Sequence, residues 1–212
     1  MTKCALFDFD GVIVDTEPLY DIFWNEAGER YGTGIPDFAA VIKGTTLPNI
    51  LKKYFGNRTE EFRQMVIKES TEYESKMELP EMPGSISFVK SLKENGVKTA
   101  LVTSSDREKV NRAFRELGIE DLFDVVVTSD LIEHGKPDPS CYLLAASKLN
   151  VKAEDCIVFE DSFAGIQAGT AAGARVIALS TTNPAETLKD KAYKVIPNFE
   201  KFSFKDYCEW CI

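Results

Sequence analysis

The chain opens with the stretch Lys3-Cys-Ala-Leu-Phe-Asp8-Phe-Asp10-Gly11, an apolar run that ends in two aspartates. The residues from Lys3 to Asp8 show no helical period, which is typical of a strand buried in a parallel sheet. Asp8 and Asp10 lie two residues apart, so in an extended chain their side chains leave the same face. We therefore expect a buried first strand that presents two carboxylates at its end.

A helical segment separates this strand from the next one. Pro18 stands at a first helical position, and apolar residues then recur at mostly three- and four-residue spacing up to Tyr31. Further helical patterns cover about 47–55 and 59–77. Residues 17–78 are therefore expected to be all-helical.

From Pro80 onward, apolar strands alternate with helical patterns. This alternation indicates an α/β fold with a parallel sheet that helices cover on both faces. We expect a core domain over 1–14 and 81–212, and an all-helical cap domain over 15–80 that is inserted after the first strand and can move as a lid. The later strands are expected over 97–102, 124–127, 156–159, 174–179 and 193–196, with helices over 106–117 and 139–149 among them.

The composition excludes several kinds of protein. The 212 residues carry 25 Lys and Arg against 34 Asp and Glu, a net charge of −9, which argues against a nucleic-acid partner. His134 is the single histidine, so any Ser-His-Asp triad would have to include it and a multi-histidine metal site is excluded. Since the longest apolar runs fall short of the roughly 18 to 20 residues that span a bilayer, we expect no membrane partner.

The five cysteines are scattered along the chain and odd in number, and we expect no signal peptide. Both features fit a protein of the reducing cytoplasm. Cys208 and Cys211 form a C-x-x-C pair, but a second pair that would complete four zinc ligands does not accompany it. A metal or redox role and idle thiols are the two interpretations of this pair.

Polar side chains follow four of the expected strands. Ligands of a parallel α/β sheet bind beyond the carboxyl ends of its strands, so we expect these side chains to meet in one crevice. Four carboxylates in one place are costly without a cation, and Mg²⁺, which prefers oxygen ligands, suits them as a cofactor. The residues are Asp8 and Asp10 after the first strand, Thr103 and Ser104 after the second, Lys136 soon after the third, and Glu160 and Asp161 after the fourth.

The same residues suit the transfer of a phosphoryl group. A carboxylate such as Asp8 can receive the group, and a second one, Asp10, can protonate the leaving oxygen and later deprotonate water. The Thr103 hydroxyl and the Ser104 N–H would form a cradle for oxyanions. Lys136 would supply positive charge to the phosphoryl oxygens.

Four motifs occur in order along nearly the whole chain. They are Asp8-Phe-Asp10-Gly-Val-Ile-Val-Asp-Thr, Val-Thr103-Ser, Gly-Lys136-Pro-Asp-Pro and Phe-Glu160-Asp161-Ser-Phe-Ala-Gly-Ile-Gln-Ala-Gly. Together they closely resemble the haloacid dehalogenase superfamily. The resemblance implies a Rossmann-like core, and the helical insertion is similar to that of the branch that includes phosphoglycolate phosphatase and β-phosphoglucomutase.

The resemblance also implies the role of each residue in the motifs. Asp8 would be the nucleophile, Asp10 the general acid and base, and Lys136 the charge-balancing lysine. Thr103 and Ser104 would bind the phosphate together with Lys136.

The metal site follows from the same resemblance. Asp8, the Asp10 carbonyl and Asp161 would hold Mg²⁺, with Glu160 supporting the metal from beside it. Members that act as dehalogenases use a single first-motif aspartate and no magnesium, so the acidic residues here disfavour a dehalogenase.

The function expected from these residues is a Mg²⁺-dependent phosphatase that hydrolyses a small phosphomonoester, of the sugar phosphate or phosphoglycolate type, through an aspartyl phosphate. A phosphomutase similar to β-phosphoglucomutase is the first alternative. It is disfavoured because Leu47 and Tyr20 stand where that family carries an arginine and a histidine, and an arginine suits a second phosphate. A non-enzymatic phospho-acceptor domain is the second alternative.

Substrate contacts from the cap are expected from a loop and an aromatic helix. We expect a small phosphorylated metabolite as the partner, a cytoplasmic location, and a monomer or weak dimer. The candidate residues of the cap are Lys43, Thr45 and Thr46 in the loop and Tyr20 and Trp24 in the helix, where both aromatic residues can equally belong to the core of the cap.

Overall fold

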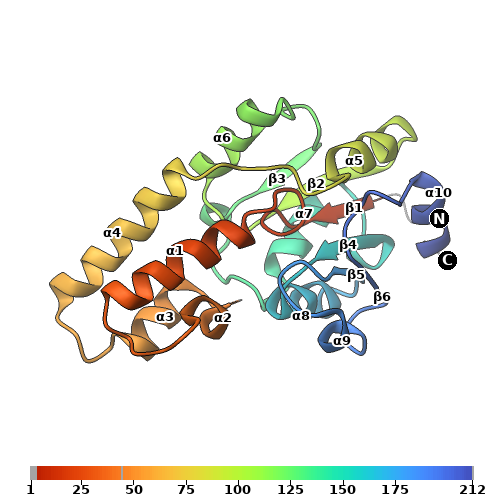
Figure 1. Cartoon of the computed structure of the whole chain (residues 1–212). Coiled ribbons are helices and arrows are strands. Elements are labelled where there is room, and N and C mark those ends of the chain that lie inside the picture. The colour runs from red at the N-terminus through yellow and green to blue at the C-terminus, as the bar shows by residue number, and fades with distance from the viewer. Residues whose placement is uncertain (1–3, 44, 212) are drawn as a thin grey trace. The chain divides into compact units, whose positions relative to one another are not determined.

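The computed structural model describes residues 4–43 and 45–211. The chain divides into two compact units, which Figure 1 shows as a sheet with its helices and a group of helices. Residues 1–15 and 79–212 form the first, here called the sheet unit, and residues 16–78 form the second, here called the helical unit.

The two chain segments at the boundary of the sheet unit are hydrogen-bonded to each other. The Asp15 amide donates to the Pro80 carbonyl at 2.8 Å, and Val14 forms an antiparallel bridge with Glu81. The Met82 amide donates to the Ile13 carbonyl at 2.9 Å. Because of this pairing the sheet unit includes residues 15, 79 and 80, which the sequence assigned to the cap domain.

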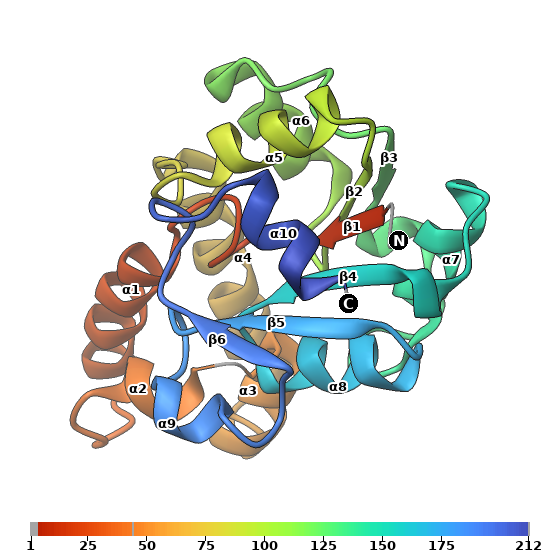
Figure 2. The same cartoon turned by 90° about the vertical axis from the view of Figure 1, so that its right-hand side faces the viewer.

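The sheet is parallel throughout and has the strand order β3-β2-β1-β4-β5-β6, so the α/β prediction is confirmed (Figure 2). Phe7 lies opposite both Leu101 and Phe159, so β1, β2 and β4 end at one edge. Lys3, expected at the start of the first strand, lies outside the described residues. The strands are β1 (Cys4–Phe7), β2 (Lys98–Val102), β3 (Val125–Val127), β4 (Cys156–Glu160), β5 (Arg175–Leu179) and β6 (Lys194–Ile196).

Helices cover both faces of the sheet, with α5, α6 and α10 on one and α7 and α8 on the other (Figure 2). The sequence did not predict α10, because seven residues are too few for a clear helical period. The helices of this unit are α5 (Ser85–Glu94), α6 (Arg107–Leu117), α7 (Ser140–Lys148), α8 (Phe163–Ala171), α9 (Ala185–Leu188) and α10 (Phe204–Trp210), with short 3-10 turns η1 (Ser129–Leu131) and η2 (Ala153–Asp155).

Aromatic rings fill the space between the sheet and α5. The rings of Phe7 and Phe159, on neighbouring strands, stack with centroids 4.7 Å apart. Phe88 of α5 stacks on Phe199 at 5.0 Å and meets both strand rings edge to face. Since aromatic side chains bury large apolar areas, this cluster fixes β1 and β4, and hence the residues that follow them.

In its described residues, the helical unit has four helices around an apolar core of its own. Pro18 lies in the first turn of α1, and Thr59 caps α4 through its side chain, so both sequence signals act at helix starts. The five-residue α2 was not predicted. The helices are α1 (Glu17–Arg30), α2 (Phe38–Ile42), α3 (Leu47–Tyr54) and α4 (Glu60–Lys76).

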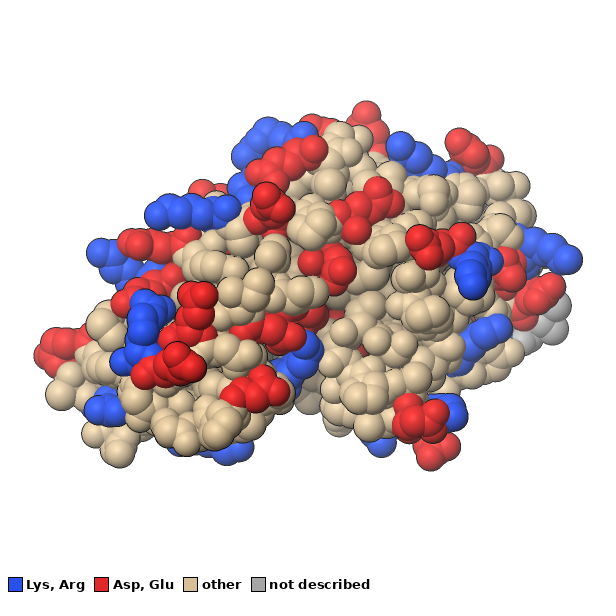
Figure 3. Space-filling view, viewed as in Figure 1, with Lys and Arg blue, Asp and Glu red and all other residues tan. Residues whose placement is uncertain are grey.

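Charge is mixed over the surface. On the face that Figure 3 shows, Lys and Arg side chains lie scattered among the more numerous Asp and Glu side chains. Among the described residues, none of the helices has both the length and the apolar character that a membrane span requires.

Replacing Phe88 by alanine is expected to destabilise the sheet unit by about 3–5 kcal/mol, because the ring is 1% exposed and its loss leaves a cavity. Chemical unfolding followed by circular dichroism measures this change. Leu143→Ala is the matched control: this side chain is 46% exposed, and its loss should cost no more than about 0.5 kcal/mol. Equal losses in the two variants would contradict the aromatic core.

Candidate functional site

Three strand ends place the candidate residues at one edge of the sheet. Asp8 follows β1, Thr103 follows β2, and Glu160 ends β4 with Asp161 directly after it. The Asp8 amide donates to the Phe159 carbonyl at 3.0 Å, which extends the pairing of β1 with β4 by one residue. The Asp8 carboxylate therefore starts opposite Glu160, one residue before Asp161.

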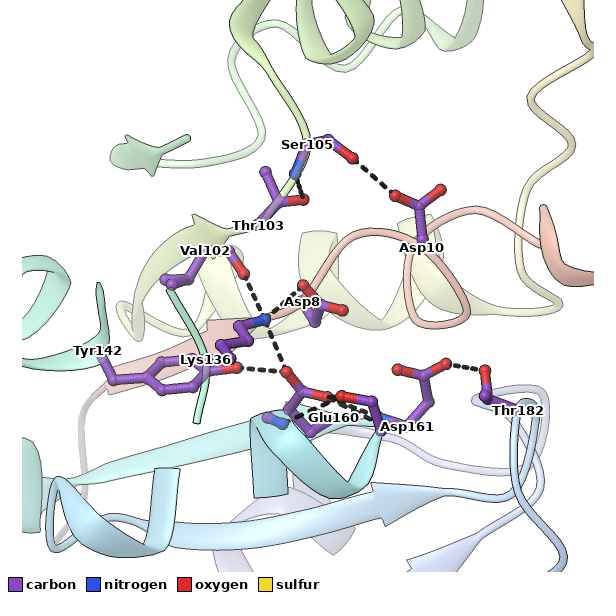
Figure 4. A network of polar contacts seen from close by, with 12 residues as sticks. Asp8, Asp10, Val102, Thr103, Ser105, Lys136, Tyr142, Glu160, Asp161 and Thr182 are labelled. Carbon is purple, nitrogen blue, oxygen red and sulfur yellow. Dashed lines mark hydrogen bonds and ion pairs between the residues drawn. The ribbon is translucent and has the colours of Figure 1, made fainter. Parts of the chain in front are cut away.

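The Lys136 ammonium lies at the centre of this edge (Figure 4). It donates to Asp8 Oδ1 at 2.7 Å, to Glu160 Oε1 at 2.6 Å and to the Val102 carbonyl at 3.2 Å. The Lys136 side chain is only 7% exposed, and its ammonium lies 5.2 Å from the centre of the Tyr142 ring. One buried cation thus joins the ends of three strands.

Hydrogen bonds occupy both oxygens of the Glu160 carboxylate. Oε1 accepts from Lys136 and from the Tyr142 hydroxyl at 2.8 Å. Oε2 accepts from the amides of Asp161 and Ser162 and from the Ser162 hydroxyl, at 3.0–3.1 Å. A Cβ at Gly165 would collide with this carboxylate, so the first turn of α8 can come this close because residue 165 is glycine.

Burial and mutual charge shift the ionisation of these groups. Burial, and to a smaller degree the nearby Glu160, raises the pKa of the Asp8 carboxyl to about 7 against the opposing effect of Lys136. Burial also disfavours the charged forms of Glu160 and Lys136, but their ion pair outweighs it, lowering the pKa of Glu160 and raising that of Lys136. Asp8 and Glu160 therefore share the Lys136 ammonium as two buried carboxylates.

Asp161 completes a buried group of carboxylates. Its ligand oxygen and those of Asp8 and Glu160 all lie within 4.8 Å of one another. The Thr182 hydroxyl donates to Asp161 Oδ2, and the Asn183 amide donates to the Asp161 carbonyl at 3.0 Å. This cluster has the oxygen chemistry of a site for a hard divalent cation.

Gly11 lies against the same carboxylate. Its φ is +72°, and a Cβ there would collide with Asp161. Glycine at this position thus makes room for the Asp161 side chain. The Thr181 hydroxyl also donates to the Gly11 carbonyl at 2.7 Å, which ties the turn after β1 to the loop after β5.

The Asp10 carboxylate lies apart from the Lys136 network. Its Oδ2 accepts from the Ser105 hydroxyl at 2.8 Å, and both oxygens accept from the Lys109 ammonium, at 2.7 and 2.9 Å. Figure 4 shows the carboxylate turned toward Ser105. Asp8 and Asp10 therefore have different basic partners although they are two residues apart.

Thr103 and Ser104 differ in their surroundings. The Thr103 side chain is buried and its hydroxyl oxygen accepts from the Ser105 amide at 2.9 Å, so this turn is closed by a side-chain bond. Ser104 is exposed. Both are at the expected end of β2, but their roles toward a phosphate stay a prediction.

Sequence reasoning missed three residue positions in this region: Lys109, Tyr142 and Thr182. Lys109 and Tyr142 reach the strand ends from the first turns of α6 and α7, and no pattern within one element shows such a contact. Thr182 lies in the loop after β5. The one available signal was its position beyond the end of an apolar strand, which the rule for parallel sheets would have included.

The cap candidates have partners within the helical unit. The Tyr20 hydroxyl donates to Glu74 at 2.6 Å, and the Lys43 ammonium pairs with Asp21 at 2.8 Å and with Glu17 at 3.4 Å.

The other cap candidates differ in burial. Trp24 is buried in the core of the unit, edge to face with Phe23 and Phe38, which agrees with the core interpretation. Thr45 and Thr46 are exposed. Gly44, in the same loop, lies outside the described residues.

The cysteine pair forms no cation site among the residues that the structure describes. Cys208 and Cys211 are not disulfide-bonded to any described residue, and both are of intermediate exposure, on and just after α10. The group of carboxylates around Asp161 is the candidate metal site found in residues 4–43 and 45–211.

Comparison with known proteins gives relatives over most of the chain. The phosphorylated carbohydrates phosphatase of Thermotoga maritima is 34% identical over 177 residues, covering 81% of this chain and 82% of that protein. Hexitol phosphatase A of Escherichia coli is 33% identical over 190 residues, covering 87% and 85%. The crystal structure of β-phosphoglucomutase from Clostridium difficile matches with a TM-score of 0.80 at 27% identity, covering 100% of this chain and 97% of that one.

Residues 5–179 match the family described as haloacid dehalogenase-like hydrolase. This range begins in β1 and ends with β5, so it includes every motif on which the resemblance rested. The resemblance inferred from those motifs is confirmed, and the chain belongs to the haloacid dehalogenase-like hydrolase family of enzymes.

Proposed function

We propose that the enzyme is a Mg²⁺-dependent phosphatase that hydrolyses a small phosphomonoester of the sugar phosphate type through an aspartyl phosphate at Asp8. The observation that carries this proposal is the Lys136 ammonium between Asp8 and Glu160, with Asp161 beside them. The names of the two phosphatase relatives support phosphorylated carbohydrates or hexitols as the substrate class.

Asp8 is proposed as the nucleophile. Because Lys136 engages Oδ1, we assign the attack on phosphorus to Oδ2. In the first step this oxygen bonds to phosphorus, the bond from phosphorus to the leaving oxygen breaks, and that oxygen takes a proton from Asp10. In the second step Asp10 takes a proton from water, the water oxygen bonds to phosphorus, and the bond to Asp8 breaks.

Lys136, Thr103 and Ser104 are proposed to bind the phosphoryl group. The ammonium already lies within 2.7 Å of Asp8, so charge that develops on the transferring oxygens forms next to a fixed cation. The Thr103 hydroxyl and the Ser104 N–H, at the end of β2, are proposed as hydrogen-bond donors to the same oxygens.

The carboxylates around Asp161 fit Mg²⁺. The donors are carboxylate oxygens, and Asp161 lies beside the two carboxylates that share Lys136, so a cation there would offset their negative charge. We propose that Asp8, Asp161 and the Asp10 carbonyl hold the ion, and that Glu160, whose oxygens already accept hydrogen bonds, supports it indirectly. Bound Mg²⁺ would stabilise negative charge on the phosphoryl oxygens.

A phosphomutase is the second candidate, favoured by the structural similarity to β-phosphoglucomutase. Leu47 argues against it, because it packs against the apolar core of the helical unit and cannot hold a second phosphate. The non-enzymatic alternative is dropped, since the family is one of hydrolases.

The Asp8→Asn variant is expected to lose at least about 10³-fold of phosphate release while remaining folded, because an amide of the same shape cannot form the aspartyl phosphate. A phosphate-release assay with Mg²⁺ over hexose phosphates, hexitol phosphates and phosphoglycolate measures this. Asp190→Asn, at an exposed position of the same unit, should keep wild-type activity. Full activity in Asp8→Asn would refute the proposed nucleophile.

Added MgCl₂ is expected to raise the melting temperature of the wild-type protein, by about 5 °C or more near 100 times Kd, because the ion binds only the folded chain. The Asp161→Asn variant should show no such rise, and Asp190→Asn should show all of it. Matching NaCl additions control for ionic strength. A full Mg²⁺ response in Asp161→Asn would place the ion elsewhere.

Incubation with β-glucose 1-phosphate and a catalytic amount of glucose 1,6-bisphosphate separates the two candidate reactions. A phosphatase releases inorganic phosphate from sugar phosphates, whereas a mutase forms glucose 6-phosphate. Phosphorus NMR follows both products in one sample. We expect inorganic phosphate as the product, and accumulation of glucose 6-phosphate without it would favour the mutase.

A further inference from the structure

Asp10 is held by a second buried lysine that none of the sequence motifs includes. The Lys109 ammonium lies 2.7 and 2.9 Å from the two oxygens of the Asp10 carboxylate. The Lys109 side chain is 6% exposed, and the Asp10 side chain is 23% exposed. Since a buried ammonium without a counter-charge is costly, this pair is a strong constraint on both side chains.

Three further contacts fix the Asp10–Lys109 pair. The Ser105 hydroxyl donates to Asp10 Oδ2 at 2.8 Å, so one oxygen has two donors. The Lys109 amide donates to the carboxylate of Asp106, the N-cap of α6, which fixes the helical turn that carries the lysine. The ammonium also lies 5.9 Å from the centre of the Phe9 ring, next to Asp10 in sequence.

These contacts separate the two aspartates of the first motif. Lys136, from the segment before α7, pairs with Asp8, whereas Lys109, from α6, pairs with Asp10. A carboxylate with donors on both oxygens cannot rotate freely about its side-chain bonds. A group that exchanges a proton with a reacting oxygen needs such a fixed orientation, because proton transfer requires hydrogen-bond distance.

We propose that Lys109, together with Ser105, is a positioning residue that orients the Asp10 carboxyl group for proton transfer to the leaving oxygen. The inference rests on the proposed function, in which Asp10 gives its proton to that oxygen as the bond to phosphorus breaks. Lys109 forms no bond to the substrate in this scheme and acts through Asp10.

Dependence on the leaving group tests the inference. An alkoxide leaving a hexose phosphate needs a proton from Asp10, whereas p-nitrophenolate is a stable anion and leaves without one. The value of kcat/KM reports the steps up to departure of the leaving group, so it isolates this proton transfer from hydrolysis of the aspartyl phosphate. The measurement is therefore kcat/KM of each variant for a hexose phosphate of the panel above and for p-nitrophenyl phosphate.

Lys109→Met keeps an unbranched side chain of similar length but removes the charge. We expect its kcat/KM to fall by at least about 10-fold for the hexose phosphate and by less than about 3-fold for p-nitrophenyl phosphate, since general acid catalysis contributes about 10²- to 10⁴-fold in total. Ser105→Ala should show the same selectivity to a smaller degree. Arg112→Met, on the same helix, is the control and should change neither value.

Asp10→Asn and Asp8→Asn separate this inference from the proposed function. Asp10→Asn should show the full selectivity, a larger fall in kcat/KM for the hexose phosphate than for p-nitrophenyl phosphate. Asp8→Asn should lose activity toward both substrates. Suppose that Asp10→Asn shows this selectivity, and that folded Lys109→Met either loses both activities equally or keeps both. The positioning role is then overturned, while the proposed function stands. If Asp10→Asn shows no selectivity, the proton-transfer role of Asp10 is wrong, and the inference with it. If Lys109→Met does not fold, Ser105→Ala decides by the same criterion.

Discussion

The site depends on one buried ammonium group. Lys136 bonds at once to the residue after β1, to the last carbonyl of β2 and to the last residue of β4. These partners come together because the strands are parallel neighbours: Phe7, the last residue of β1, lies opposite Leu101 and Phe159, each one residue before the end of its strand. A positive charge in this position lets carboxylates of neighbouring strands lie close together inside the protein.

Ion pairs with individual lysines explain how a chain with a net charge of −9 can hold several carboxylates at one edge of the sheet. Asp8 shares Lys136 with Glu160, and Asp10 has Lys109. Hydrogen bonds from backbone amides and hydroxyl groups stabilise the carboxylates further, since Glu160 and Asp161 accept from the residues around them. The proposed cation would add positive charge beside the carboxylates of Asp8, Glu160 and Asp161.

Sequence patterns predicted the sheet and the residues at its strand ends, because both depend on order along the chain. An apolar run predicts a buried strand, and a parallel sheet brings the residues after each run, such as Asp8 and Asp161, to one edge. Lys109 and Tyr142 could not be found this way, since their contacts depend on how a helix lies on the sheet and how far a side chain reaches. Helices α2 and α10 were missed because they are too short for a periodic pattern.

The paired segments at Val14 and Glu81 bear on how the inserted helical unit can vary in evolution. The helical unit leaves and re-enters the sheet unit at neighbouring points, since Asp15 is bonded to Pro80. A short turn could join these two points directly, whatever the length of the helical insertion between them. The helical insertion is therefore an exchangeable module: its length and sequence can change while the strand order of the sheet stays the same.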